Sequence, residues 1–255
     1  MGEKTVSPSA AKKKTIEYTT LLQEISDQQL NASISIKLSD LGLRQSISLT
    51  KRNLERLLTI AQDTNQIIEI DMEYRSLVQP TIDVAILMIR QGFQFRLAIQ
   101  SGLTAALPLA RRLLRIARRS TGNIGFRIVT GSCYSHNADG YCTTLETTEA
   151  QTIAQFHMLL CLARRWRQQG GLCSAVGTQN LDRIVLASRY GCEVQLLKGE
   201  EHTKAYLLAK ELQNKGHACL AFYVGYGNPD DEGVQAYLLR RIQGTDSGKV
   251  SDQNS

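Results

Sequence analysis

The chain has 255 residues, of which 42% are hydrophobic and 21% are charged, enough for one large domain with its own apolar core. Its formal net charge of +6 is modestly basic, and no apolar run approaches the roughly 20 residues of a membrane span. The absence of such a run excludes a transmembrane helix within the sequence, and the positive net charge is compatible with an anionic partner.

Strand and helix patterns alternate along the chain between two polar ends. We expect residues 1–15 to form a disordered leader and residues 244–255 a disordered tail. Pro80 suits the first turn of a helix, and apolar residues recur with a helical period in residues 49–62. The predicted helices cover residues 16–30, 49–62, 80–90, 105–119 and 147–167. The predicted strands cover residues 33–38, 67–73, 95–100, 125–131, 172–178, 193–197 and 219–224, with a long loop before residue 147. This alternation indicates a parallel sheet with helical crossovers.

Most of the predicted strands end on, or just before, a polar residue. These residues are Lys37, Asp71, Gln100, Thr130 and Gln179. In a (β/α)8 barrel the carboxyl ends of the strands line the active site, so polar residues are expected there. A doubly wound sheet is the alternative, but no Gly-rich phosphate loop follows the first strand. The sequence therefore predicts an α/β fold, a TIM-like (β/α)8 barrel over residues 16–243, although the first 31 residues supply no convincing eighth strand.

The last predicted strand leads into a helix that carries an aromatic residue and two arginines. Arg240 and Arg241 follow Tyr237 by three and four residues, so all three side chains can share one helical face. Paired guanidinium groups beside an aromatic ring suit a small carboxylate ligand. The alternative is that the two arginines belong to a solvated surface.

Three other features of the sequence do not point to a specific functional site. The six cysteines form no CxxC pair, so we expect reduced thiols in a cytoplasmic protein. Cys133, His136 and Cys142 share one loop, but their spacing matches no common zinc motif, and we predict no metal. A basic stripe within residues 111–119 lacks interleaved aromatic residues, which favours a solvated helix face over a nucleic-acid site.

Six segments, taken in order, resemble strands of the proline dehydrogenase family and, in the last segment, a strand with its Arg-Arg helix; members of this family are FAD-dependent barrels. The segments read SIKLSDLGL, IEIDMEYR, LAIQSG, FRIVTGSCY, EVQLLKG and FYVGYG…AYLLRRI, and the similarity runs from Ser33 to Ile242. The resemblance implies oxidation of L-proline, or of a close cyclic imino acid, to pyrroline-5-carboxylate by hydride transfer to FAD.

The resemblance also implies roles for individual residues. The implied substrate-binding residues are Lys37, Asp71, Tyr223, Tyr237, Arg240 and Arg241. The implied flavin-contacting residues are Gln100, Arg127, Thr130 and Gln179. Leu197 would form part of the wall around the substrate ring.

Some family positions hold other residues here. Thr130 stands where the family has lysine, Cys133 where it has tyrosine, and Gln179 where it has histidine. We therefore expect FAD to bind more weakly than in the family at large. The alternative function is a divergent, catalytically impaired barrel that binds a small carboxylate in a regulatory or repurposed biosynthetic role. The expected partner is a proline-like amino acid, with no nucleic acid and only peripheral contact with a membrane or quinone; the oligomeric state is not predicted.

Overall fold

The computed structural model describes residues 7–72, 75–130, 133–137, 140–144, 146–197 and 203–224. Their main feature is a parallel sheet of seven strands in the order β1-β2-β3-β4-β7-β8-β9. These strands are β1 (Ile34–Lys37), β2 (Ile68–Asp71), β3 (Gln94–Gln100), β4 (Asn123–Val129), β7 (Ala175–Gly177), β8 (Glu193–Leu197) and β9 (Cys219–Tyr223). Each strand lies beside the preceding one in the sheet, as the crossovers of a barrel require.

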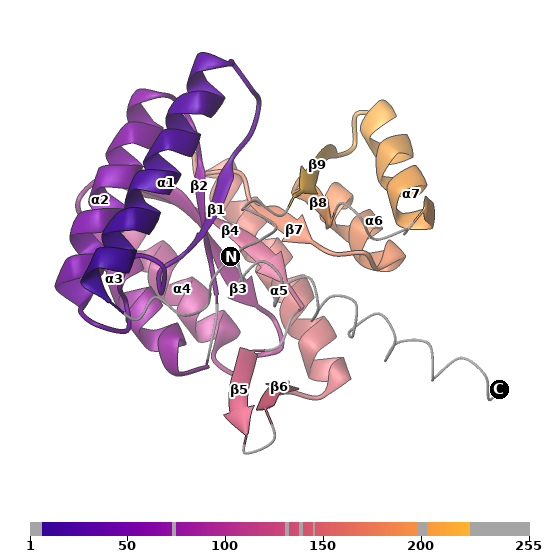
Figure 1. Ribbon diagram of the computed structural model, residues 1–255. Coiled ribbons are helices and arrows are strands. Elements are labelled where there is room, and N and C mark those ends of the chain that lie inside the picture. Colours follow the sequence, from indigo (N-terminus) through magenta and orange to yellow (C-terminus); the bar gives the residue numbers. More distant parts are fainter. Residues whose placement is uncertain are drawn as a thin grey trace.

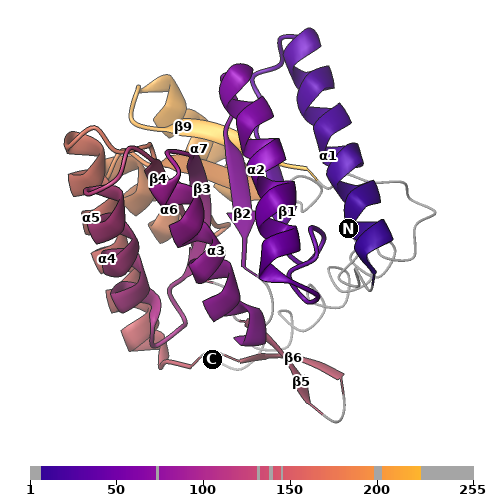
Figure 2. The same cartoon turned by 90° about the vertical axis from the view of Figure 1, so that its left-hand side faces the viewer.

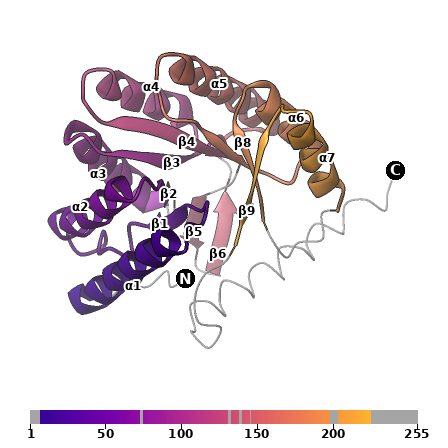
Figure 3. The ribbon, with the colours of Figure 1, turned by 90° about the horizontal axis from the view of Figure 1, so that it is seen from above.

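Helices cover one face of this sheet (Figure 1). They are α1 (Pro8–Asp27), α2 (Ile47–Asp63), α3 (Val78–Arg90), α4 (Ala106–Ala117), α5 (Glu149–Gln168), α6 (Leu181–Arg189) and α7 (Thr203–Asn214), with a short 3-10 helix η1 (Arg75–Leu77) before α3. Seen from above, the helices form an arc outside the strands, and the sheet curls within that arc (Figure 3). Within the described residues β1 and β9 do not pair with each other, so the predicted parallel barrel is confirmed in an open, seven-stranded form.

The apolar core lies between the sheet and the helices. Strand β3 shows why: Phe95, Leu97 and Ile99 are buried in the hydrophobic core, while Arg96 makes polar contacts on the other face. Alternate side chains of a strand point to opposite faces, so one strand supplies both an apolar core and a polar interior. Each fully buried large apolar side chain stabilises the fold by about 1.5–3 kcal/mol.

Two predicted features differ from the structure. Helix α1 begins at Pro8 rather than at residue 16, because Ser7 caps it by accepting a hydrogen bond from the Ala10 amide at 3.2 Å. Lys12 and Lys13 are the exposed face of this helix, and Ala11 opposite them is buried. The disordered leader predicted for residues 1–15 is therefore wrong from Pro8 onward.

The second difference is the segment predicted as a long loop after the fourth strand. It contains an antiparallel hairpin of β5 (Cys133–Asn137) and β6 (Gly140–Thr144). The hairpin follows β4 and precedes α5, and Figure 2 shows it projecting beyond the carboxyl end of the sheet. None of the helices in the described ranges combines the length and apolar character needed to cross a bilayer.

Helix α1 is joined to the end of β1 by a buried hydrogen bond. The Tyr18 hydroxyl donates to Oδ2 of Asp40 at 2.8 Å, while Asp40 Oδ1 is buried without a partner among the described residues. Burial raises the pKa of Asp40, and the hydrogen bond from Tyr18 and the charge of Lys37 act in the opposite direction. The native state therefore favours the neutral carboxyl more than the unfolded chain does.

Replacing Asp40 by Asn is expected to stabilise the protein at pH 7. A group with a raised native pKa favours folding fully below its unfolded value of 3.8 and loses that contribution as the pH rises through the native value. Asp40→Asn should gain about 1 kcal/mol at pH 7, which raises Tm by roughly 2–4 °C, and the gain should vanish near pH 3. Thermal unfolding at both pH values tests this against Asp27→Asn, an exposed control. A lower Tm of Asp40→Asn at pH 7 would contradict it.

Candidate active site

Four strands bring polar side chains together at the carboxyl end of the sheet. Lys37 and Asp71 are the last residues of β1 and β2 and are partners in the parallel register. The carboxylate of Asp71 accepts a hydrogen bond from Arg127 Nη1 at 2.7 Å and one from the Tyr223 hydroxyl at 3.2 Å. Tyr223 ends β9, so the curl of the sheet places residues from its first, middle and last strands around one carboxylate.

Arg127 is held at the centre of this group. Its Nε donates to Oε1 of Gln195 at 2.7 Å, and its Cζ lies 4.7 Å from the centre of the Tyr223 ring. The side chain is 14% exposed. Burial acts to lower the pKa of Arg127, but the carboxylates of Asp71 and Glu69 raise it above its usual range. The guanidinium is therefore a fixed positive charge, stacked on an aromatic ring and bound to a carboxylate.

A second layer of charges lies below this one inside the barrel. Arg96 Nη1 donates to Glu69 at 2.8 Å and to Glu193 at 3.0 Å, and Arg96 Nε donates to the Cys173 carbonyl at 2.9 Å. Burial would lower the pKa of Arg96, but the charges of Glu193 and Glu69 raise it. Gly125 lets the Cys173 carbonyl that Arg96 binds approach β4, because a Cβ atom there would lie 2.7 Å from the Cys173 carbonyl oxygen and 3.2 Å from Arg96 Cγ.

Gln195 connects the two layers. Its Nε2 donates to Glu69 at 2.7 Å and to Glu193 at 2.9 Å, while its Oε1 accepts from Arg127. Because both amide protons face carboxylates, only one orientation of the amide satisfies all of these contacts. Arg127 is thus positioned from below by Gln195 and from above by Asp71.

Gly177, at the end of β7, leaves room beside Arg127. A Cβ atom at Gly177 would lie 3.3 Å from Arg127 Nη2 and 3.2 Å from Val129 Cγ1, so a larger residue would crowd the guanidinium. Nearby, Gln179 donates to the Leu197 carbonyl at 3.4 Å, but its Oε1 is buried with no partner in the described part of the chain. A guanidinium edge beside a glycine and an unsatisfied amide fit a planar polar group such as the flavin of FAD.

The other predicted site residues lie at the same end where the structure describes them. Gln100 ends β3 and is buried, Thr130 directly follows β4, and Leu197 ends β8 in register with Tyr223. Thr130 accepts a hydrogen bond from Arg183 of α6. Tyr237, Arg240 and Arg241 lie outside the described residues.

Sequence reasoning missed four residues of the interior network: Glu69, Arg96, Glu193 and Gln195. None of the four is the carboxyl-terminal residue of its strand, and reasoning from polar residues considered only those ends; Arg127, also within its strand, came from the family resemblance. The signal was available, because Glu69 and Asp71, like Glu193 and Gln195, occupy alternate positions and so share the inner face of a strand.

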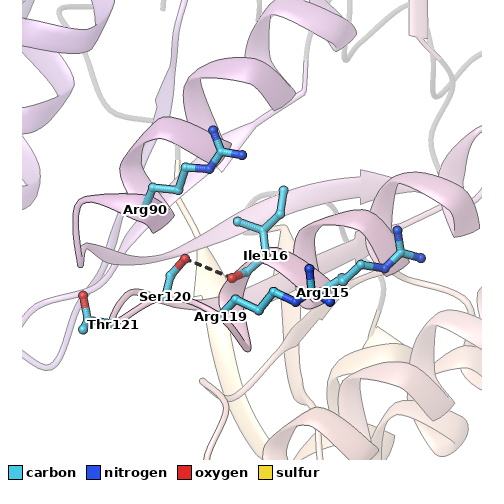
Figure 4. Close-up of a pocket in the computed structure, with 6 residues that line it drawn as sticks. All are labelled: Arg90, Arg115, Ile116, Arg119, Ser120 and Thr121. Atoms are coloured by element: carbon cyan, nitrogen blue, oxygen red, sulfur yellow. Dashed lines mark hydrogen bonds between the residues drawn. The ribbon is translucent and has the colours of Figure 1, made fainter.

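A separate cavity of about 460 Å³ lies at the opposite end of the sheet. Figure 4 shows it between the ends of two helices, with Arg90 on α3 and Arg115 and Arg119 on the α4 side. Its lining residues come shortly before the amino ends of β3 and β4, whereas Asp71 and Tyr223 lie at the carboxyl ends of their strands. Arg90 and Arg115 lie in the last turns of α3 and α4, where a positive charge interacts favourably with the negative end of the helix dipole. This interaction explains the arginine cluster without a bound ligand.

The fold and site define a class: a parallel α/β barrel whose carboxyl end holds a carboxylate, a guanidinium and a phenol. Within that class, the chain belongs to the proline dehydrogenase family, because the family model described as "Proline dehydrogenase" matches residues 1–249. Proline dehydrogenase 1 of Bacillus subtilis (strain 168) is 26% identical over 247 residues, which cover 95% of this chain and 75% of that protein. Proline dehydrogenase 2 of the same organism is 32% identical over 84 residues, 33% of this chain and 28% of that protein.

Solved structures show the same fold at low sequence identity. The crystal structure of proline utilization A (PutA) from Bdellovibrio bacteriovorus inactivated by N-propargylglycine matches with a TM-score of 0.78 and 17% identity, covering 100% of this chain and 31% of that chain. A bifunctional PutA protein matches with a TM-score of 0.75 and 20% identity, covering 98% of this chain and 28% of that chain. The chain therefore spans less than a third of these PutA chains.

Proposed function

We propose that the chain catalyses FAD-dependent oxidation of L-proline, or of a close cyclic imino acid, to pyrroline-5-carboxylate. Membership of the proline dehydrogenase family supports this proposal. The structural observation that carries it is the Asp71 carboxylate shared by Arg127 and Tyr223, with Lys37 in register beside it. This group joins a fixed charge and an aromatic surface at the end of the barrel where such folds bind substrates.

The charges of the interior indicate which residues would bind the substrate carboxylate. Arg96 and Arg127 already face the three carboxylates Glu69, Asp71 and Glu193. An added anion would therefore need further cations, since an unpaired buried charge is costly. We propose that Lys37, Arg240 and Arg241 provide them.

The remaining residues would place the substrate ring. The apolar ring of proline would pack against Tyr223, Tyr237 and Leu197, while Asp71 fixes the Tyr223 hydroxyl and so the plane of that ring. Oxidation removes a hydride from the ring carbon next to nitrogen and a proton from the nitrogen, leaving a C=N double bond. A bound flavin would supply the acceptor for this hydride. Gln100, Arg127, Thr130 and Gln179 would contact the flavin, and the chain's contribution is placement and a fixed positive charge at Arg127.

Replacing Arg241 by Met is expected to weaken binding of a proline analogue by 30-fold or more, because truncating one partner of a buried charge pair costs about 2–5 kcal/mol. Arg112→Met, at an exposed position of α4, is the matched control. The measurements are the absorbance bands of the purified protein with added FAD, proline-dependent reduction of a dye acceptor, and analogue binding.

Each outcome separates the hypotheses. Equal analogue binding by wild type and Arg241→Met would show that the carboxylate site is elsewhere. If the wild-type protein binds the analogue but does not reduce the dye at saturating FAD, the oxidoreductase hypothesis gives way to the alternative, a divergent barrel that binds a small carboxylate.

A further inference from the structure

Arg183 brings a third guanidinium to the carboxyl end of the barrel. It is the third residue of α6, which begins shortly after β7, and its Nη1 donates to Oγ1 of Thr130 at 2.8 Å. Its Cζ lies 5.7 Å from the centre of the Phe156 ring, which supports the side chain from α5. The guanidinium therefore lies at the carboxyl end of β4, the strand that carries Arg127 and pairs with β7.

The charge of Arg183 is not neutralised by its contacts. Thr130 offers a neutral hydroxyl, and no carboxylate of the described ranges lies within 4.0 Å of the guanidinium. Burial lowers the pKa of Arg183, and the charge of Glu149 acts in the opposite direction. Arg96 and Arg127 differ, because each has a carboxylate at hydrogen-bond distance. A half-buried guanidinium with a neutral partner favours an anionic ligand.

We propose that Arg183 binds the diphosphate of FAD and supplies the positive charge lost where Thr130 replaces the lysine of the family. This inference rests on the proposed function, since it takes FAD as the cofactor. The negative charge of oxidised FAD is on its diphosphate, whereas the isoalloxazine ring and ribityl chain are neutral. An arginine fork matches phosphate oxygens in geometry as well as charge.

The test is FAD affinity measured by quenching of flavin fluorescence. Arg183→Gln keeps a donor for Thr130 but removes the charge, and should raise the Kd for FAD about tenfold or more. The same variant should leave the Kd for riboflavin, which has no phosphate, within twofold of wild type. Arg189→Gln, at the exposed end of the same helix, is the control and should bind FAD like wild type. Circular dichroism and Tm establish that each variant is folded.

A rescue experiment makes the assignment specific. Adding Thr130→Lys to Arg183→Gln should restore most of the FAD affinity, because a lysine at the end of β4 returns the charge to the same place. The proposal is overturned if Arg183→Gln binds FAD as tightly as wild type, or weakens riboflavin and FAD equally. If neither the wild-type protein nor the Arg189→Gln control binds FAD, the cofactor assignment itself is overturned. That result differs from one in which both bind FAD and only the role of Arg183 fails.

Discussion

Replacing Arg96 by Leu is expected to lower the free energy of unfolding by about 3–5 kcal/mol, because Glu69 and Glu193 lose the guanidinium that is hydrogen-bonded to both of them. Glu69 is 2% exposed and Arg96 is 9% exposed, so water does not replace the lost contacts. The same change removes the donor to the Cys173 carbonyl. An unsatisfied buried acceptor adds to the cost.

Urea unfolding at pH 7 measures this effect, with Arg90→Leu as the exposed control, for which we expect a change within about 0.5 kcal/mol. Adding Glu69→Gln to Arg96→Leu should recover part of the loss, since it neutralises one of the two carboxylates that lose Arg96. A loss below about 1 kcal/mol for Arg96→Leu would show that the interior network contributes little to stability.

Replacing Asp71 by Ala is expected to reduce kcat/KM for proline by about 30-fold or more. Arg127 would lose its carboxylate at 2.7 Å, and Tyr223 would lose its acceptor. Truncating one partner of a buried charge pair costs about 2–5 kcal/mol, and each 1.4 kcal/mol is tenfold in rate. Tyr223→Phe removes the longer hydrogen bond but leaves Asp71 bound to Arg127, and should have a smaller effect.

Proline-dependent dye reduction at saturating FAD measures this prediction. Asp63→Ala, exposed at the end of α2, is the matched control and should retain wild-type activity. A kcat/KM for Asp71→Ala close to that of wild type would show that Asp71 is not part of the site. A loss in Tyr223→Phe as large as that in Asp71→Ala would show that Asp71 acts through the Tyr223 hydroxyl rather than through the Arg127 guanidinium.

The sequence predicted the barrel and the place where the site residues meet. This was possible because strand and helix patterns differ in period and because polar residues such as Lys37 and Asp71 stand at strand ends. The start of α1 was missed because Lys12, Lys13 and Lys14 read as a polar leader, whereas only packing against α2 shows that Ala11 and Tyr18 are buried. The hairpin of β5 and β6 was missed because its strands lack a continuous apolar pattern.

The interior ion network could not be derived from local pattern. Its partners Glu69, Arg96 and Glu193 come from three strands, and which charge meets which depends on the register and curl of the sheet. The sequence around Gly125 and Gly177 does not show that these glycines lie against Arg96 and Arg127. These contacts are tertiary, and a single sequence does not encode them in any local window.

The connection between distant strands also has a kinetic consequence. Glu69 and Arg96 are separated by 27 positions, but Glu69 and Gln195 are separated by 126, and Asp71 and Tyr223 by 152. Loop closure over such distances slows folding. During synthesis from the N-terminus, Arg96 meets Glu69 first and waits for Glu193 until β8 has been made. We expect the site around Asp71 to assemble last, when β9 docks, so a ribosome-bound chain would acquire its helices and inner strands well before it could bind a substrate.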